Sequence, residues 1–503
     1  MSVLTDIIAQ ARRVEGHRPW PRVVVAPEAW RVVASELAAG HVTLLGLWGD
    51  TGAVHMAVMD EVAGDINVVS IECPDRGFPS VGALHSPAIR LERAIQSLYG
   101  LEPLGAVDTR PWLDLGSWGV QHPLGARTPA PAERPAYPFL PVEGEGLHRI
   151  PVGPVHAGII EPGHFRFTAN GETVVRLEER LGYVHKGIES LMAGATIERA
   201  AQLAGRTSGD STVAYALAFA HAVEAALNIA VPPRAYYLRA LMAELERLAN
   251  HFGDIGAICN DASFSLMHAH CSILRERILR AADACFGHRL MMDRIIPGGV
   301  ACDLAADGAL HLRETFAEIR QRFPRLTELY DNTASLQDRT AKTGVLRTEL
   351  AHQFGAGGYV GRASGRVFDV RKTFRYAPYD QLEFEVPVLA AGDVNARVWV
   401  RIHEVEQSLA LGDQILRRLP DGAIAVSVTA TGEASEGLGL VEGFRGDVLA
   451  WLRLEGNRVV RCHLRDPSWF QWPLLEAAIE GNIVADFPLC NKSFNCSYSG
   501  HDL

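Results

Sequence analysis

One apolar helical segment of the chain carries an unusual number of charges. It reads Arg239-Ala240-Leu241-Met242-Ala243-Glu244-Leu245-Glu246-Arg247-Leu248-Ala249-Asn250-His251. Helical spacing puts Arg239, Glu246 and Asn250 on one face, opposite a face of leucines. If the segment is buried, its charges must pair with opposite charges, whereas on a solvated face they form ordinary Glu–Arg pairs. The residues alone leave both interpretations open.

This segment is one of several long helical patterns. They cover residues 192–229, 235–258, 265–293, 308–336 and 395–418. Pro232-Pro233 and Pro297-Gly298-Gly299 separate some of them, as helix-breaking residues do. Several of the patterns are too apolar for a solvated surface, which predicts a central bundle of long helices.

The first part of the chain predicts a small α/β domain over residues 1–122. Three β-rich runs, at 41–48, 54–59 and 65–72, are separated by Gly and Asp and indicate a small sheet with hairpin-like connections. A helical pattern begins at Pro87 and ends near Gly100.

A proline-rich linker is predicted over residues 123–154. It contains Pro123, Pro129, Pro131, Pro135, Pro138, Pro141, Pro151 and Pro154. Such a density excludes regular helix and favours extended polyproline geometry. We therefore place a domain boundary here, with a second, mainly helical domain over residues 155–503.

Two parts of the second domain predict antiparallel strands. Residues 165–167 and 174–177 flank Asn170-Gly171, the signal of a hairpin with a type I′ turn. Strand-like alternation returns near the C-terminus at residues 426–430, 447–454 and 458–464. The predicted fold class is therefore α+β, with a small N-terminal α/β domain and a large C-terminal domain whose long-helix bundle is flanked by short antiparallel sheets.

Composition narrows the functional classes. The 503 residues include 48 Lys and Arg against 59 Asp and Glu, a formal net charge of −11, which argues against nucleic acid as the main partner. No secretory signal and no apolar run of membrane-spanning length is apparent. None of the eight cysteines forms a C-x-x-C pair, which argues against zinc ribbons, thioredoxin-like pairs and cysteine-ligated iron–sulfur clusters. They are Cys73, Cys259, Cys271, Cys285, Cys302, Cys462, Cys490 and Cys496.

A series of motifs resembles a known family. The first three are Gly153-Pro154-Val155-His156, Glu161-Pro162-Gly163-His164-Phe165-Arg166-Phe167 and Gly182-Tyr183-Val184-His185-Lys186-Gly187-Ile188-Glu189, and the others lie at residues 239–251, 294–300, 369–373 and 379–388. They resemble the large subunit of membrane-bound [NiFe] hydrogenases, as in formate hydrogenlyase, and the D subunit of NADH-quinone oxidoreductase, respiratory complex I. Residues 91–101 resemble a helix motif of the C subunit of complex I, and formate hydrogenlyase large subunits combine both parts. The resemblance covers nearly the whole chain.

The resemblance implies where metal ligands would stand. Active [NiFe] hydrogenases hold nickel and iron with two C-x-x-C pairs, because thiolate is the soft, charged ligand that such a centre requires. Here the first pair corresponds to Ser208 and Ser211 and the second to Ser497 and Gly500, with Cys496 one residue early. A serine hydroxyl does not ionise at neutral pH and ligates such a centre poorly. We therefore expect no [NiFe] centre.

The other role within the family is a quinone pocket. The resemblance implies a histidine on the hairpin loop and a tyrosine on the first bundle helix as partners of the quinone head group. His156 and His164 match loop histidines, and the tyrosine position corresponds to Arg206. A phenol can donate a proton to a reduced quinone, whereas a guanidinium cannot. For His156, a structural hydrogen bond to backbone is the equally supported alternative.

We predict a functional cavity between the hairpin loop and the first bundle helix. Its lining would comprise His156, His164, Arg206, Ser208, Asp210, Ser211 and Ser497, and we expect Arg206 and Asp210 to pair. A polar relay from the cavity is predicted along Arg239, Glu244, Glu246, Arg247, Asn250, His251 and Lys372. In related hydrogenases a glutamate and a C-terminal histidine can hold magnesium, and Glu189 and His501 stand at those positions as a remnant magnesium site.

The sequence thus predicts a peripheral-arm subunit of a complex I-like membrane redox complex, on the cytoplasmic side of the membrane and without a transmembrane helix. The resemblance implies a hetero-oligomer with an iron–sulfur small subunit and membrane subunits of the proton-pump type. No cofactor is assigned to this chain; its cavity would bind a quinone or another small substrate, and the chain is not expected to be active alone. Two alternatives stay open: an active [NiFe] hydrogenase large subunit, and a non-catalytic scaffold that couples redox change to the membrane subunits.

Overall fold

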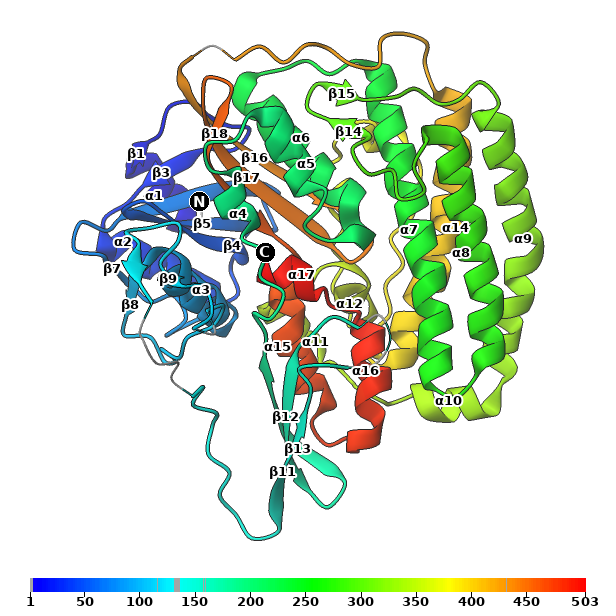
Figure 1. Ribbon diagram of the computed structural model, residues 1–503, viewed down its shortest axis with the longest axis horizontal. Coiled ribbons are helices and arrows are strands. Elements are labelled where there is room, and N and C mark those ends of the chain that lie inside the picture. Colours follow the sequence, from blue (N-terminus) through cyan, green and yellow to red (C-terminus); the bar gives the residue numbers. More distant parts are fainter. Residues whose placement is uncertain (1–2, 115, 131–135, 157, 159, 431) are drawn as a thin grey trace.

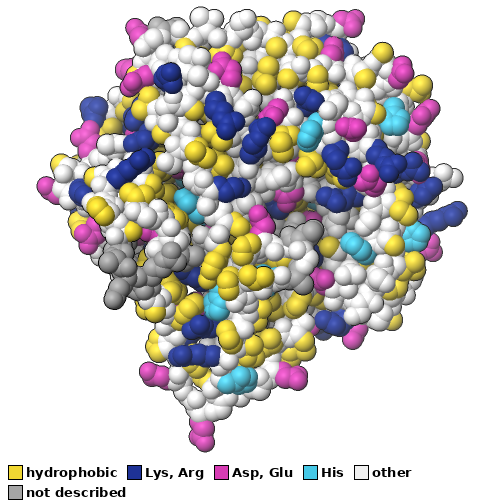
Figure 2. Space-filling model, in the orientation of Figure 1, with side chains coloured by type: hydrophobic (Ala, Val, Ile, Leu, Met, Phe, Trp, Pro, Cys, Tyr) yellow, Lys and Arg dark blue, Asp and Glu magenta, His cyan; other side chains and the backbone are white. Residues whose placement is uncertain are grey.

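The computed structural model describes residues 3–114, 116–130, 136–156, 158, 160–430 and 432–503 (Figure 1). Pro131 and Pro135 of the predicted linker lie outside the described residues. Helices and sheets both contribute substantially, so the α+β class is confirmed. Among the described helices, none combines the length and the apolar content that a membrane crossing requires. On the face shown in Figure 2, basic side chains are interspersed with acidic and apolar ones.

The N-terminal part is built on a five-stranded sheet with the strand order β1-β3-β6-β5-β4. The three predicted strands and the predicted helix are present, whereas the shorter strands β1 and β3 had no clear sequence signal. Its elements are α1 Val3–Gln10, β1 Arg12–Arg13, β3 Arg22–Val24, α2 Pro27–Ala38, β4 Thr43–Asp50, β5 Ala53–Asp60, β6 Asp65–Glu72, β7 Gly77–Pro79, η1 Ser86–Ala88, α3 Ile89–Tyr99, β8 Glu102–Leu104, β9 Val120–Gln121 and β10 Thr128–Pro129.

The hairpin predicted around Asn170-Gly171 forms, and it carries a third strand. The sheet consists of β11 Leu147–Val152, β12 His164–Asn170 and β13 Thr173–Arg180 (Figure 1). Part of the predicted linker is therefore strand, and Pro151 is tolerated because β11 is an edge strand. The type I′ prediction is wrong: the two loop residues are Gly171 and Glu172, and only Gly171 has a positive φ, whereas type I′ needs two.

Long helices form the predicted bundle, at the right of Figure 1. They are α7 Pro233–Asp261, α8 Ser265–Phe286, α9 Gly308–Asn332 and α14 Val394–Arg418. Helix α7 packs against both α8 and α14, and almost every residue of its middle section is buried, charged ones included. Of the two interpretations of the 239–251 segment, burial is the one observed: Arg239, Glu244 and Arg247 form ion pairs, and the backbone amides of Val213 and Ala214 donate to Glu246.

The predicted helix over 192–229 is interrupted. The chain forms α4 Ile188–Met192 and α5 Ile197–Ala204, turns at Gly205, and enters α6 Thr212–Leu227 through the single turn η2 Gly209–Ser211. Ser208 has an extended backbone (φ −144°, ψ 126°), which a continuous helix could not contain. The break places the side chains of Ser208, Asp210 and Ser211 at the N-terminal end of α6.

A second sheet supports α6. Strands β16 Ala434–Glu442, β17 Asp447–Glu455 and β18 Arg458–Arg465 are antiparallel, and the N-terminal strand β2 His17–Arg18 joins β16 in parallel. A Cβ atom at Gly437 would lie 1.9 Å from the carbonyl oxygen of Ala222, so only glycine allows α6 to lie this close to the sheet. Residues 426–430 form no strand, although Ala425 forms an isolated bridge with Gly299 and the Val426 amide donates to the carbonyl of Gly298.

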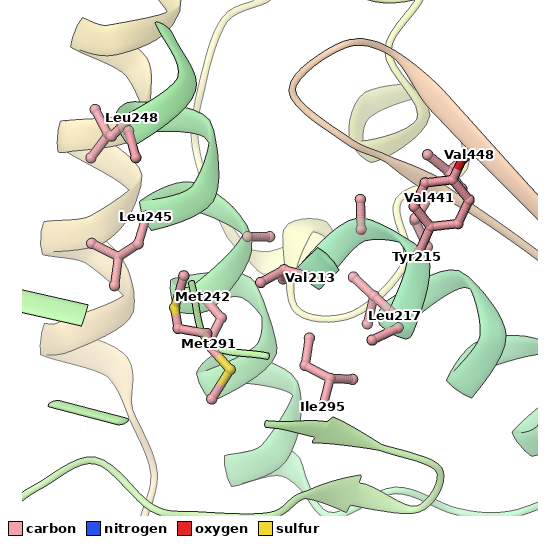
Figure 3. Close-up of a cluster of buried hydrophobic side chains, with 14 of the residues drawn as sticks. Val213, Tyr215, Leu217, Met242, Leu245, Leu248, Met291, Ile295, Val441 and Val448 are labelled. Carbon is pink, nitrogen blue, oxygen red and sulfur yellow. The ribbon is translucent and has the colours of Figure 1, made fainter. Parts of the chain in front are cut away.

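The remaining elements surround the site or connect the bundle. They are β14 Ile295–Ile296, β15 Gly299–Val300, α10 Ala334–Thr340, α11 Thr348–Gln353, α12 Gly358–Ala363, α13 Val370–Thr373, η3 Tyr379–Gln381, α15 Ser468–Ile479, η4 Val484–Asp486, α16 Phe487–Phe494 and α17 Tyr498–Asp502. One apolar core joins α6, α7 and the second sheet, with Val213, Met242 and Val441 among its members (Figure 3). Another core contains residues of both predicted domains. The division into two domains stays a prediction.

Candidate functional site

A cavity of about 300 Å³ lies where the loop before β12, the α5–α6 break and the C-terminal helices meet. The β16–β17 turn, whose residues Gly443 and Gly446 are joined by backbone hydrogen bonds, contributes Arg445 to its wall. The lining residues are Ile160, Glu161, Ser208, Gly209, Asp210, Asp261, Arg445, Pro488, Asn491, Lys492, Asn495, Cys496, Ser497, Tyr498 and Ser499. Ser208, Asp210 and Ser497 of the sequence-predicted set are among them.

The four positions that correspond to metal ligands lie close together. The hydroxyl oxygens of Ser208 and Ser497 are 3.2 Å apart. Ser208 and Ser211 both donate hydrogen bonds to Asp210 Oδ1, at 2.6 and 3.2 Å. The amide of Gly500 donates to Ser497 Oγ at 2.8 Å. Two segments almost 300 residues apart in sequence thus form one cluster of oxygen atoms.

An ion pair stands next to this cluster. Arg445 Nη2 lies 2.6 Å from Asp210 Oδ2, Arg445 Nη1 donates to Ser211 Oγ at 3.1 Å, and Arg445 Nε donates to the carbonyl of Asn495 at 2.5 Å. Burial alone would raise the pKa of Asp210, but the charge and hydrogen bond of Arg445 outweigh it and lower that pKa. Burial would likewise lower the pKa of Arg445, and Asp210 reverses the effect. Both groups are therefore charged.

The predicted pairing of Arg206 with Asp210 is wrong. Arg206 lies on the surface and forms a two-pronged ion pair with Asp293, at 2.6 and 2.7 Å. Asp210 pairs with Arg445 instead, because the β16–β17 turn brings that guanidinium to the buried end of η2. Arg206 is not among the residues that line the cavity.

The side chains at the ligand positions do not suit a [NiFe] centre. Serine hydroxyls replace thiolates at three positions, and burial raises the pKa of the one nearby thiol, Cys496, which keeps it protonated. At the fourth position, a Cβ atom on Gly500 would lie 2.4 Å from Asp466 Oδ2 and 2.8 Å from the hydroxyl of Tyr215. The space of the fourth ligand is therefore filled by other side chains, and the Arg445 cation would repel a metal ion.

The two loop histidines are bonded to backbone. His156 Nε2 donates to the carbonyl of Gly163 at 2.8 Å, and His164 Nδ1 donates to that of Gly153 at 3.2 Å. Burial lowers the pKa of His164 and favours its neutral form. Neither histidine is among the cavity-lining residues. The geometry matches the structural alternative for His156, in which the ring bonds to backbone.

The residues of the predicted relay divide into separate groups. Glu244, Arg247 and His251 belong to a fully buried ionic network around Glu404, whose other members are Arg362, Asp369, Arg371 and Glu442. Glu246 and Asn250 lie near Asp210, where Asn250 Nδ2 donates to the Asp210 carbonyl at 2.8 Å. Arg239 pairs with Glu224, and Lys372 is exposed and donates to the carbonyl of Phe384.

Glu189 and His501 each have protein partners. Glu189 Oε1 accepts hydrogen bonds from His463 Nδ1 at 2.9 Å and from the amide of Leu464 at 3.0 Å. His501 Nδ1 bonds to Asp502 Oδ1 at 2.8 Å, and Trp112 Nε1 donates to its other nitrogen at 3.3 Å. Across the described residues no group of three or more His, Cys, Asp or Glu side chains is arranged to hold a metal ion. The magnesium site thus stays a prediction without structural support.

Two family models match the middle of the chain, including one part of this site. The model of nickel-dependent hydrogenases matches residues 186–253, and that of the 49 Kd subunit of respiratory-chain NADH dehydrogenase matches residues 261–433. The first covers the α5–α6 break and the charged part of α7. The second covers α8, α9 and α14 with the network residues Arg362, Asp369, Arg371 and Glu404, whereas Arg445 and the C-terminal helices lie outside both matches. The fold and the clustered ligand positions therefore define a protein of the hydrogenase and complex I class.

Curated relatives narrow this class. Formate hydrogenlyase subunit 5 of Escherichia coli (strain K12) is 31% identical over 445 residues, which are 86% of this chain and 78% of that protein. The C/D subunit of NADH-quinone oxidoreductase of Phocaeicola vulgatus is 28% identical over 82% of this chain and 84% of that protein. The alpha subunit of the membrane-bound hydrogenase of Pyrococcus furiosus is 28% identical over 69% and 85%. The chain belongs to the family that contains formate hydrogenlyase subunit 5 and the related subunits of complex I-like and membrane-bound hydrogenase complexes.

Proposed function

We propose that the chain is a peripheral-arm subunit of a complex I-like membrane redox complex, and that its cavity binds a quinone or another small substrate beside the positions that the family resemblance assigns to [NiFe] ligands. The observation that carries the proposal is the Asp210–Arg445 ion pair beside the Ser208–Ser497 contact. The ion pair lies next to the four positions that correspond to metal ligands, and a cavity of about 300 Å³ adjoins it.

The chemistry of the cavity wall supports a ligand with acceptor oxygens. Lys492 and Asn491 line the cavity and carry N–H donors, whereas the side-chain amide of Asn495 already donates to Asp254 Oδ1 at 2.9 Å. Within the part of the chain that the structure describes, the Lys492 ammonium has no carboxylate partner within 4.0 Å, so a ligand oxygen can take that place. Ile160, Pro488 and the ring of Tyr498 supply the apolar surface that a quinone ring needs.

The names of the relatives support the proposed setting. They are subunits of formate hydrogenlyase, of NADH-quinone oxidoreductase and of a membrane-bound hydrogenase. By analogy with these relatives, we propose that the chain binds an iron–sulfur subunit, which donates electrons, and membrane subunits of the proton-pump type. We also propose that it lies on the cytoplasmic side of the membrane. The same proposal includes the division into two domains, residues 1–122 corresponding to the C subunit of complex I and residues 155–503 to its D subunit.

The two alternatives make different demands on the site. An active [NiFe] hydrogenase needs four soft ligands, which Ser208, Ser211, Ser497 and Gly500 do not supply. A pure scaffold needs no ligand-accessible cavity. The cavity wall therefore favours a binding function over the scaffold.

Ligand binding to the intact complex tests the proposal. We expect decylubiquinone, a short-chain quinone, to bind with a micromolar Kd, and we expect Lys492→Gln to weaken binding by about tenfold, the equivalent of one charge-assisted hydrogen bond. Arg277→Gln, at an exposed position of α8, is the matched control and should leave Kd unchanged. Absence of binding to the wild-type complex would leave the scaffold, and stoichiometric nickel in that complex would restore the hydrogenase alternative.

A further inference from the structure

A second, smaller cavity adjoins the site. Its volume is about 100 Å³, enough for a few water molecules at about 30 Å³ each. Gly209 and Asp210 line both cavities, so a single stretch of η2 separates them. The small cavity is therefore placed to connect the site with another part of the surface.

The wall of the small cavity combines exposed basic, apolar and buried acidic residues. Arg275 of α8 and Arg289 line it and are exposed to solvent. The intervening wall is apolar and consists of Leu245, Ala249, Ile278, Leu279, Ala282, Leu290 and Met291. Asn250 and the buried carboxyl group of Glu246 complete the lining, next to Asp210. The wall of the small cavity thus contains two exposed arginines and one buried acid.

Glu246 is held at the N-terminal end of α6. Its carboxyl oxygens accept hydrogen bonds from the amides of Val213 at 2.7 Å and Ala214 at 3.1 Å. Burial raises the pKa of Glu246 to about 8, although these two amides and Arg247 act in the opposite direction. The charged groups that face it are Asp210, Arg247 of its own helix, and Arg275 and Arg289 across the cavity. Glu246 therefore carries an exchangeable proton at neutral pH.

We propose that the small cavity is a proton entrance to the site and that Glu246 is its proton-transfer residue. This inference rests on the proposed function. Reduction of a quinone to a quinol takes up two electrons and two protons; the electrons come from the iron–sulfur cluster proposed for the partner subunit. For each proton, the Glu246 carboxyl gives its proton toward the site past Asp210, and the resulting carboxylate is reprotonated from bulk solvent, with the water molecules of the small cavity relaying the proton and ending unchanged. Glu246 thus returns to its starting state after each transfer.

The test is quinone reduction by the intact complex, with reduced methyl viologen as the electron donor and decylubiquinone as the acceptor. We expect Glu246→Gln to lower kcat at least tenfold with KM within twofold of wild type. The wild-type kcat should fall as pH rises through about 8, where Glu246 loses its proton, and that inflection should vanish in Glu246→Gln. Glu246→Asp keeps a carboxyl group and should recover most of kcat with a shifted inflection.

Two further variants separate proton entry from a structural role of the α6 contact. Ala282→Leu adds side-chain volume to the small cavity from α8 and keeps the Glu246 carboxyl, so kcat should fall while a pH inflection remains. The exposed Glu145→Gln is the matched control and should change neither. Unchanged kcat in Glu246→Gln, or a lowered kcat with the wild-type inflection, overturns the inference and leaves the proposed function standing. If the wild-type complex neither binds nor reduces decylubiquinone, both the proposed function and this inference are refuted.

Discussion

The hydroxyl oxygens of Ser208 and Ser497 lie 3.2 Å apart, although 289 positions separate the two residues in the chain. Ser208 precedes η2, which leads into α6, and Ser497 precedes α17, the last helix. The contact therefore joins the N-terminal end of α6 to the C-terminal helices. Two of the positions that the family resemblance assigns to metal ligands are thus in direct contact through their hydroxyl groups.

This contact predicts a disulfide when both residues are replaced by cysteine. In the double variant Ser208→Cys/Ser497→Cys the two sulfur atoms start close enough to approach bonding distance by rotation of their side chains. Oxidation of the full chain should remove two free thiols and produce a cross-linked product in a peptide map. Ser208→Cys alone is the control, because Cys496 would be its only cysteine neighbour at the cavity wall. Persistence of both thiols in the double variant would contradict the observed geometry.

For the Asp210–Arg445 pair, we expect removal of the carboxylate alone to destabilise the protein, because a buried cation is left without its partner. Asp210→Asn leaves the buried Arg445 guanidinium without its carboxylate, a loss of about 1.5–3 kcal/mol for hydrogen bonds to a charged group. The side chain of Asp210 is 37% exposed to the cavity against 3% for Arg445, so we expect the lower half of that range. Urea denaturation of the full chain measures it.

A second variant shows whether the cost comes from the unpaired cation. Asp210→Asn/Arg445→Gln removes both charges and should be less destabilised than the sum of its single variants. Asp293→Asn breaks the exposed pair with Arg206 and should cost less than about 1 kcal/mol. Equal effects of Asp210→Asn and Asp293→Asn would show that Arg445 finds a replacement partner.

Local patterns in the sequence reveal the elements of this site but not all of their partners. Helix α7 was predictable because its leucines repeat with helical spacing, and Ser208 and Ser211 were noticed because they keep a ligand spacing. Arg445 had no such signal, because it lies in a turn between two strands and reaches Asp210 only through tertiary packing. The same reason accounts for the expected pairing of Asp210 with Arg206, the nearer arginine in sequence.

The carboxyl group of Glu246 predicts a stability difference that grows with pH. In the folded protein its pKa is raised from 4.5 to about 8, so the folded state binds one more proton than the unfolded chain between these values. Folding free energy is therefore lost as pH rises through this interval, by up to about 1.4 kcal/mol per pH unit. Glu246→Gln has no proton to lose, so its stability relative to wild type should rise from pH 5 to pH 8.

Chemical denaturation of both full chains at several pH values measures this difference. Other groups that titrate in the interval are shared by both proteins, and their contributions cancel in the comparison. The exposed Glu145→Gln should show a difference from wild type that does not change with pH. A constant difference for Glu246→Gln as well would mean that Glu246 is already ionised at pH 5.

The buried network around Glu404 makes the last prediction. Glu404 accepts hydrogen bonds from Arg362 Nη2 at 2.5 Å and from His251 Nε2 at 2.7 Å, and it lies 3.6 Å from Arg247. Burial raises the pKa of Glu404, but the charge of Arg362 and the hydrogen bond from His251 outweigh it and hold that pKa well below its usual range. Glu404 is therefore the ionised acceptor on which these partners depend.

Replacing Glu404 with Gln should destabilise the full chain by about 3 kcal/mol, the lower end of the range for breaking a buried pair. The loss stays at the lower end because burial and the nearby Asp369 raise the pKa of Glu442, the carboxyl group that also pairs with Arg362, so Glu442 is not fully ionised at neutral pH. When Glu404 is neutral, Glu442 can ionise and take over part of the charge balance. Glu276→Gln, which disturbs exposed pairs with Arg280 and Arg289, is the matched control and should cost less than about 1 kcal/mol. Urea denaturation distinguishes the two, and a Glu404→Gln variant as stable as Glu276→Gln would mean that the network does not depend on that charge.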